Sequence, residues 1–233
     1  MRRSRPAVGA CAVAATVLAV LAVVLSPARA KTVNSRYAAG SEIASPQVNS
    51  LALRAAPGST RVLARVRSET VFGSPTRLAV VVDDGDWLEV ISDLLPNNVH
   101  GYVRRSDVSL TRSGFVLEAD LSRRELVVWR WGEPTRRFRI AIGARISPTP
   151  TGRFSITDKY SHYEPAFYGC CVLALSGHQT HLPPGWTGGN RLAIHEGRGI
   201  GQAVSAGCLR ASAANARYLM HTIPLGTQVV IKP

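Results

Sequence analysis

The chain has 233 residues, of which 45% are hydrophobic and 18% are charged. This length allows one or two domains, and the composition excludes both an intrinsically disordered protein and a membrane protein with several spans. The formal charge of +13 favours an anionic partner, such as nucleic acid, an anionic membrane or an anionic wall polymer.

The first thirty residues have the layout of a secretory signal peptide. A basic segment, residues 1–5, precedes an uncharged apolar stretch, residues 7–25, and small residues then provide an Ala-x-Ala cleavage pattern that ends at Ala30. An uncleaved membrane anchor is the alternative, because nineteen apolar residues could just span a bilayer. Either form is exported to the cell wall or the periplasmic space, where nucleic acid is not an expected partner.

Cleavage after Ala30 leaves a charge of +9 and an odd number of cysteines, namely Cys170, Cys171 and Cys208. Neighbouring cysteines seldom bond to each other, because the small ring strains the intervening peptide. At least one thiol is therefore expected to stay free. A free thiol in an exported protein is a candidate for a reactive cysteine.

Residues 31–50 are small, polar and without periodicity, which predicts a linker. Residues 51–110 then contain short alternating apolar runs separated by turn residues, a pattern typical of a small β-barrel. The expected strands lie at 61–66, 69–72, 78–82, 87–91 and 101–103.

The order of motifs in this region resembles a bacterial SH3-like domain. Val-Phe-x-x-Pro at 71–75 precedes an apolar strand and an acidic turn, and Asp-Trp-Leu-Glu-Val at 86–90 precedes Gly-Tyr-Val at 101–103. Modules of that family often accompany cell-wall enzymes. Because residues 51–110 contain no cysteine and only His100 as a histidine, we expect this domain to have a binding or positioning role and not to catalyse.

Residues 113–233 form a second domain that is also expected to be mainly β. Two paired strands are predicted at 115–120 and 125–131, and Ser212 is a suitable N-cap for a helix over 213–222. Long loops are expected over much of 160–190. Further strands are predicted at 137–143, 153–156, 172–175, 192–195 and 227–231.

The candidate chemistry lies between residues 194 and 210. A cysteine nucleophile reacts as the thiolate, and His195 can act as its base if the fold brings it to Cys208. Gly207 lets the backbone approach a substrate carbonyl, where nearby amides could stabilise an oxyanion. An extended 208–210 segment would place Cys208 and Arg210 on one face, where Arg210 could hold a carboxylate or shape the turn. Acyl transfer is the simplest chemistry that uses all four residues.

These residues resemble the signature of the L,D-transpeptidase catalytic domain, also called the YkuD domain. The signature reads His-x-Gly at 195–197, a short loop, and Ser-x-Gly-Cys-x-Arg at 205–210. Thr-Pro-x-Gly-x-Phe at 149–154 and the closing segment 224–231 are similar to further family strands, so the resemblance spans residues 115–232. It implies a β-sandwich-like fold without a metal or another cofactor.

The resemblance also implies a function. Members form an acyl-enzyme from a peptidoglycan tetrapeptide stem, release the terminal D-alanine and transfer the acyl group to an amine, which cross-links two diamino-acid residues. Cys208 is then the nucleophile and His195 the base. Peptidoglycan stem peptides are the expected partners of a monomer, with anionic wall polymers as further partners.

Two residues depart from the family pattern, Glu196 after the histidine and Ala206 after the motif serine. Glu196 still offers the backbone carbonyl that orients the histidine in this family. Gly207 and Glu196 are thus expected to give backbone support at the oxyanion site. Ser205 and Arg210 are expected to bind substrate or shape the site.

Several alternatives remain open. Water could replace the amine, which would make the protein an L,D-carboxypeptidase, and a non-catalytic wall-binding protein would use only the SH3-like module and the positive charge. Papain-like peptidases place cysteine before histidine, and sortases place their arginine on a later strand. A zinc peptidase is disfavoured, because no carboxylate follows His178 and His181 at ligand spacing, so we expect loop histidines in a substrate lid.

Overall fold

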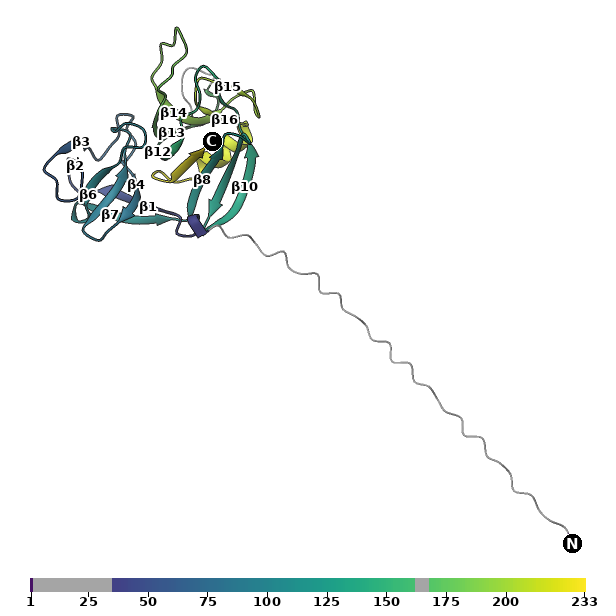
Figure 1. Cartoon of the computed structure of the whole chain (residues 1–233), viewed down its shortest axis with the longest axis horizontal. Coiled ribbons are helices and arrows are strands. Elements are labelled where there is room, and N and C mark those ends of the chain that lie inside the picture. Colours follow the sequence, from purple (N-terminus) through teal and green to yellow (C-terminus); the bar gives the residue numbers. More distant parts are fainter. Residues whose placement is uncertain (2–34, 162–167) are drawn as a thin grey trace. The chain divides into compact units, whose positions relative to one another are not determined.

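The computed structural model describes residues 35–161 and 168–233, together with Met1. The predicted signal peptide, residues 1–30, therefore lies outside the described residues apart from its first. Strands dominate the described chain, and one α-helix lies near the C-terminus (Figure 1), which confirms the predicted mainly β fold class. No helix in the described ranges is long and apolar enough to cross a membrane.

The first sheet, called the N-terminal sheet below, has seven antiparallel strands in the order β3-β2-β6-β5-β4-β1-β7. Its own hydrophobic core includes Leu51, Leu88 and Val103, which are fully buried. Short 3-10 turns at Ser35–Tyr37 and Arg105–Asp107 precede β1 and β7. The strands are β1 (Ser41–Pro46), β2 (Leu51–Arg54), β3 (Val62–Val66), β4 (Leu78–Asp83), β5 (Trp87–Ile91), β6 (Gly101–Arg104) and β7 (Val108–Ser113).

Two expectations for this region are wrong. Residues 31–50 were expected to form a linker, but β1 lies within them and pairs with β4 and β7. The sequence of β1 shows no alternating apolar pattern, because some of its buried residues are polar. Ser41 is buried, and its hydroxyl donates to the carbonyl oxygen of Phe115 and accepts from the backbone amide of Gln228. The predicted strand at 69–72 is a loop, closed by an isolated bridge between Glu69 and Pro75.

The second sheet, the C-terminal sheet, has eight strands in the order β10-β9-β8-β17-β12-β13-β14-β16. Two of its pairings are parallel, β17 with β8 and β14 with β16. Its strands are β8 (Phe115–Asp120), β9 (Glu125–Arg130), β10 (Glu133–Arg139), β12 (Gly152–Tyr160), β13 (Val172–His178), β14 (Arg191–Glu196), β16 (Leu209–Ala211) and β17 (Gln228–Lys232). A separate parallel pair joins β11 (Ile142–Gly143) to β15 (Ala203–Ser205).

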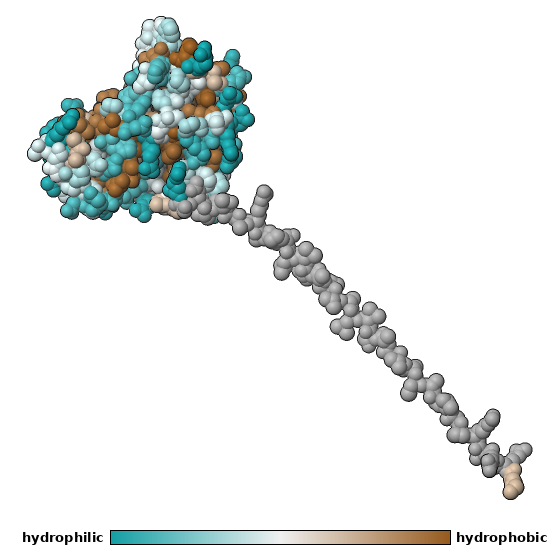
Figure 2. All heavy atoms as spheres, viewed as in Figure 1, coloured by the Kyte–Doolittle hydropathy of each residue, from teal (hydrophilic) through white to brown (hydrophobic). Residues whose placement is uncertain are grey.

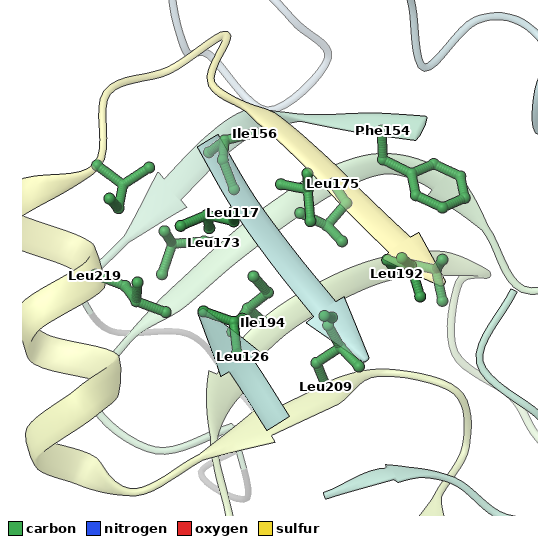
Figure 3. Packing of buried hydrophobic residues seen from close by; sticks show 14 of the residues in the cluster. Leu117, Leu126, Phe154, Ile156, Leu173, Leu175, Leu192, Ile194, Leu209 and Leu219 are labelled. Carbon is green, nitrogen blue, oxygen red and sulfur yellow. The ribbon is translucent and has the colours of Figure 1, made fainter. Parts of the chain in front are cut away.

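The helix α1 (Ala213–Thr222) begins where the sequence predicts it. The side chain of Ser212 caps it by accepting a hydrogen bond from the backbone amide of Asn215. Leu219 projects from α1 into the core of the C-terminal sheet (Figure 3). Burial of one such leucine stabilises a fold by about 1.5–3 kcal/mol, so the helix is fixed mainly by this packing.

The core of the C-terminal sheet decides which side chains are available for chemistry. Ile194 of β14 and Leu209 of β16 are fully buried among the residues shown in Figure 3. Because side chains alternate along a strand, the residues next to them point away from this core. On the face of the molecule shown in Figure 2, hydrophobic residues form scattered small groups between hydrophilic ones.

Candidate active site

The parallel pairing of β14 with β16 assembles the site. The register places His195 beside Arg210 and the buried Ile194 beside the buried Leu209. His195 and Arg210 therefore project from the face opposite to the core, and Cys208 lies two residues before Arg210. All three line one cavity of about 50 Å³. Ser205 lines the same cavity, so the structure brings four of the predicted site residues together.

The turn before the cysteine requires glycine. Gly207 has a φ of +115°, and a Cβ at this position would collide with the side-chain amide of Gln179. The hydroxyl of Ser205 accepts from the amide of Gly207 at 3.1 Å and donates to the carbonyl oxygen of Cys208 at 2.6 Å. Ser205 therefore shapes the turn. The amide of Gly207 is occupied by this hydroxyl, so Gly207 supports the site through its backbone conformation.

Two further residues hold this turn from outside. Gln179 is buried, and its Nε2 donates to the carbonyl oxygens of Ala206 at 3.1 Å and Pro148 at 3.0 Å. Thr149 donates from its hydroxyl to the carbonyl oxygen of Gly207 at 2.8 Å. Sequence reasoning missed these contacts, although Thr149 belongs to the Thr-Pro-x-Gly motif. Gln179 lies between the two histidines considered for zinc, His178 and His181, and no motif marks it.

The imidazole of His195 is held in its neutral form. Its side chain is 2% exposed, and burial lowers its pKa to about 4, with the charge of Arg210 acting in the same direction. Backbone hydrogen bonds to Glu196 and Tyr168 oppose this shift. Nδ1 lies 2.6 Å from the carbonyl oxygen of Glu196, and donation to that oxygen leaves the lone pair on Nε2. The ring of Tyr168 packs edge-on against the imidazole at 4.8 Å between centroids.

Cys208 is a partly exposed residue with a free thiol, which confirms the expectation of at least one free cysteine. Burial raises its pKa, while the backbone amide of Ala193 and the charge of Arg210 lower it. At neutral pH the thiol and the imidazole of His195 are therefore both uncharged, and the thiolate has to form during the reaction. No hydrogen bond among the described residues joins the two side chains, but they face the same cavity.

Glu196 acts through its side chain as well as its carbonyl. Its Oε2 accepts from the amide of Cys170 at 2.7 Å, and its own amide donates to the carbonyl oxygen of Cys171 at 3.2 Å. These contacts hold a tight turn at Gly169, where φ is +68°. Within this turn Cys170 and Cys171 form a disulfide, so the expectation that these neighbours stay unbonded is wrong.

Neither of the histidines considered for zinc, His178 and His181, lines the cavity that contains Cys208. His178 lies in β13, and its Nε2 donates to the carbonyl oxygen of Asp93 at 2.8 Å. His181 contacts the hydroxyl of Thr180 through Nδ1. Within residues 35–161 and 168–233, no group of three or more His, Cys, Asp and Glu residues is placed to hold a metal ion.

Comparison with known proteins gives a family match and distant structural likenesses. Residues 114–231 match the family model YkuD, the L,D-transpeptidase catalytic domain. An L,D-transpeptidase from Mycobacterium smegmatis is 16% identical with a TM-score of 0.43, and the match covers 66% of this chain and 80% of that one. L,D-transpeptidase 3 from Mycobacterium tuberculosis is 14% identical with a TM-score of 0.45, and the match covers 71% of this chain and 77% of that one. Another L,D-transpeptidase from Mycobacterium tuberculosis is 19% identical with a TM-score of 0.42, and the match covers 57% of this chain and 64% of that one. No curated protein matches the chain.

Proposed function

We propose that this chain, which belongs to the L,D-transpeptidase catalytic domain (YkuD) family over residues 114–231, is an exported peptidoglycan L,D-transpeptidase that works through a thioester on Cys208. The observation that carries this proposal is the β14–β16 pairing. It places a free thiol, a neutral imidazole and a guanidinium around one cavity, on the side of the strands that faces away from the core.

The first half-reaction forms the acyl-enzyme. Nε2 of His195 takes the thiol proton, and Sγ of Cys208 attacks the carbonyl carbon of the third residue of the tetrapeptide stem. A C–S bond forms, and the carbonyl becomes an oxyanion. When this intermediate collapses, the C–N bond breaks, and the imidazolium returns the proton to the departing amine of D-alanine. A thioester and a neutral His195 remain.

The second half-reaction transfers the acyl group. The amine of a second stem attacks the thioester carbon, its proton passes to His195, and the C–S bond breaks. Sγ leaves as a thiolate and recovers its proton from the imidazolium, which regenerates the starting site. L,D-carboxypeptidase action uses water in place of the amine with the same two residues, so the outcome depends on what occupies the acceptor position.

Arg210 is proposed to bind the terminal carboxylate of the stem. Its side chain makes no hydrogen bond or ion pair with any other described residue, although it lines the cavity beside His195. A guanidinium offers a planar fork of donors that matches a carboxylate. A positive charge here also keeps His195 unprotonated, because it disfavours a second cation nearby.

The region of residues 51–110 is proposed to be an SH3-like module that positions the enzyme on the cell wall. The charge of +9 that remains after loss of residues 1–30 would attract anionic wall polymers. A protein that only binds the wall is the competing proposal. That proposal does not explain why Cys208, His195 and Arg210 line one cavity.

Product analysis tests the proposed function. The purified protein is incubated with tetrapeptide muropeptides, and the products are separated by mass. We expect cross-linked dimers and free D-alanine from the wild type, and neither from Cys208→Ala. Tripeptides without dimers would support the carboxypeptidase instead, and unchanged tetrapeptide would contradict both enzymatic readings.

A further inference from the structure

A second cavity, of about 100 Å³, adjoins the cavity that contains Cys208. The two share the lining residues Tyr168, Gly189, Arg191 and Leu192. We call the second one the lateral cavity. Most of its other walls come from the C-terminal sheet, but Phe72 comes from the N-terminal sheet, in the loop between β3 and β4.

The lateral cavity lies on the face of the C-terminal sheet that carries His195, called the catalytic face below. The register of β13 with β14 places Val172 beside His195 and Ala174 beside Ala193. Tyr160 of β12 lies beside Val172 in turn. These residues all belong to the side of the strands that carries His195, so one surface leads from the thiol across β14 and β13 to the edge formed by Phe72.

Cross-sheet contacts fix the loop that carries Phe72. The hydroxyl of Thr70 donates to Oδ1 of the buried Asp158 on β12. The ring of Phe72 packs edge-on against Tyr160 at 6.0 Å between centroids, and the guanidinium of Arg191 lies 5.8 Å from the ring centroid of Phe72. Phe72 nevertheless stays 42% exposed, so part of its surface is open to a ligand.

A further ion pair ties the two sheets at this place. Arg191 donates from one guanidinium nitrogen to Oδ2 of Asp93 at 2.7 Å and from another to the hydroxyl of Thr157 at 2.8 Å. The carbonyl oxygen of the same Arg191 lies 4.0 Å from Sγ of Cys208. The N-terminal sheet is therefore braced against the residue that separates the two cavities.

We propose that Phe72 is a substrate-binding residue, and that the N-terminal sheet thereby completes the site for the stem peptide that brings the acceptor amine. This inference rests on the proposed function. The acceptor is an aliphatic chain that ends in a primary amine, and the lateral cavity offers it mostly apolar walls, including Phe72, Tyr160, Val172 and Ala174.

The position of the lateral cavity relative to His195 suits the acceptor amine. An amine that enters from the lateral cavity passes beside Val172 and Tyr168, both next to His195, before it reaches the thioester. The base that must take its proton therefore lies on its path. Phe72 makes and breaks no bond in the transfer. It holds the chain while nitrogen attacks the thioester carbon, the C–S bond breaks and the amine proton moves to His195.

The test compares Phe72→Ala with Val71→Ala in the full chain. Val71 is a matched control, because it is 80% exposed in the same loop and lines neither cavity. An isotopically labelled tetrapeptide muropeptide serves as donor and an unlabelled tripeptide muropeptide with a free diamino-acid amine as acceptor. The rate of Cys208 acylation, the release of D-alanine and the ratio of labelled dimers to labelled tripeptides are measured at increasing acceptor concentration.

We expect Phe72→Ala to acylate within twofold of the wild type, while the acceptor KM rises about tenfold and products shift from dimers to tripeptides. Val71→Ala should match the wild type, and Phe72→Leu should fall between the two. An unchanged acceptor KM in Phe72→Ala would overturn the inference, and so would an equal loss of acylation and dimer formation. If the wild type itself is never acylated on Cys208, the proposed function fails and this inference fails with it. Normal wild-type acylation with an unaffected Phe72→Ala removes the inference alone.

Discussion

Two cysteine-bearing turns lie on opposite edges of strand β14, and they differ in what surrounds the sulfur. On one edge Cys208 directly precedes β16, and on the other Cys170 and Cys171 directly precede β13. Both turns contain a glycine of positive φ, Gly207 and Gly169. The first sulfur is free and faces a cavity with His195, whereas the other two are bonded to each other.

The contacts around a cysteine, more than its exposure, separate a candidate nucleophile from a structural sulfur. The turn of Cys208 is held by hydrogen bonds from Gln179, Thr149 and Ser205 to backbone atoms, and its thiol takes part in no disulfide. The turn of Cys170 is held by the carboxylate of Glu196. Changes on either edge should therefore have different consequences.

The largest change is expected from Gly207→Ala. The new Cβ would displace Gln179 from its buried hydrogen bonds, and the φ of +115° adds backbone strain. We expect a loss of about 3 kcal/mol in the free energy of unfolding and a loss of more than about a hundredfold in acylation rate. Gly58→Ala is the control, because Gly58 has a φ of +72° with open space around it, so it reports strain alone. Equal effects of the two substitutions would show that Gln179 does not fix the turn.

The titration of His195 should appear in the pH dependence of stability. Its pKa is about 4 in the folded protein and about 6.5 when unfolded, so the unfolded state binds the extra proton between these values. The stabilisation is complete above pH 6.5 and is lost as the pH falls through 4, by about 3 kcal/mol. Cys170 and Cys171, on the other edge of β14, do not contribute to this pH dependence, because cysteines in a disulfide do not titrate.

Denaturant unfolding of the wild type and His195→Gln at several pH values measures this difference. The variant should lose about 3 kcal/mol less than the wild type between pH 7 and pH 4. His221→Gln is the matched control, because His221 is exposed on α1. A wild-type profile that coincides with that of His195→Gln would mean that His195 is not buried as a neutral group.

Arg210→Lys tests whether the edge with Cys208 needs a guanidinium or only a charge. Lysine keeps the charge but loses the planar fork, and a lost charge-assisted contact costs about 1.5–3 kcal/mol, or roughly ten- to a hundredfold in rate. Stopped-flow acylation of Arg210→Lys and Arg210→Ala would measure this, with melting curves to establish folding. Rates within twofold of the wild type would leave Arg210 as a solvated surface residue.

Glu196→Gln should have the smallest effect. Glutamine retains an acceptor oxygen for the amide of Cys170 and keeps the backbone carbonyl that orients His195, so only the charge is lost. We expect acylation within about threefold and a change in stability of about 1 kcal/mol or less. Glu196→Ala, which removes the acceptor, should be worse in both measurements. A large effect of Glu196→Gln would mean that the negative charge itself serves the site.

Much of the fold can be predicted from local patterns. The strands at 87–91 and 115–120 and the helix at 213–222 have the predicted bounds, because their alternating or helical apolar faces are the faces that become buried. β1 could not be predicted in this way, since the buried Ser41 is satisfied by Phe115 and Gln228, which are distant in sequence.

The residues of the site likewise fall into those that local sequence predicts and those that it does not. Cys208, His195, Gly207 and Arg210 could be located because they lie in one compact motif. Gln179, the Cys170–Cys171 disulfide and the approach of Phe72 to the catalytic face could not, because each depends on which loops the sheet register brings together. Residues that carry the proposed chemistry are local in sequence, and those that hold or extend the site are not.

Trapping the acyl group on its cysteine tests the central claim most directly. The wild type, Cys208→Ala and the double variant Cys170→Ser with Cys171→Ser are treated with a carbapenem, a class that acylates this family, and the adducts are mapped by mass spectrometry. The account predicts one adduct on Cys208 in the wild type and in the double variant, and none in Cys208→Ala. An adduct that persists in Cys208→Ala, or that disappears in the folded double variant, would contradict it.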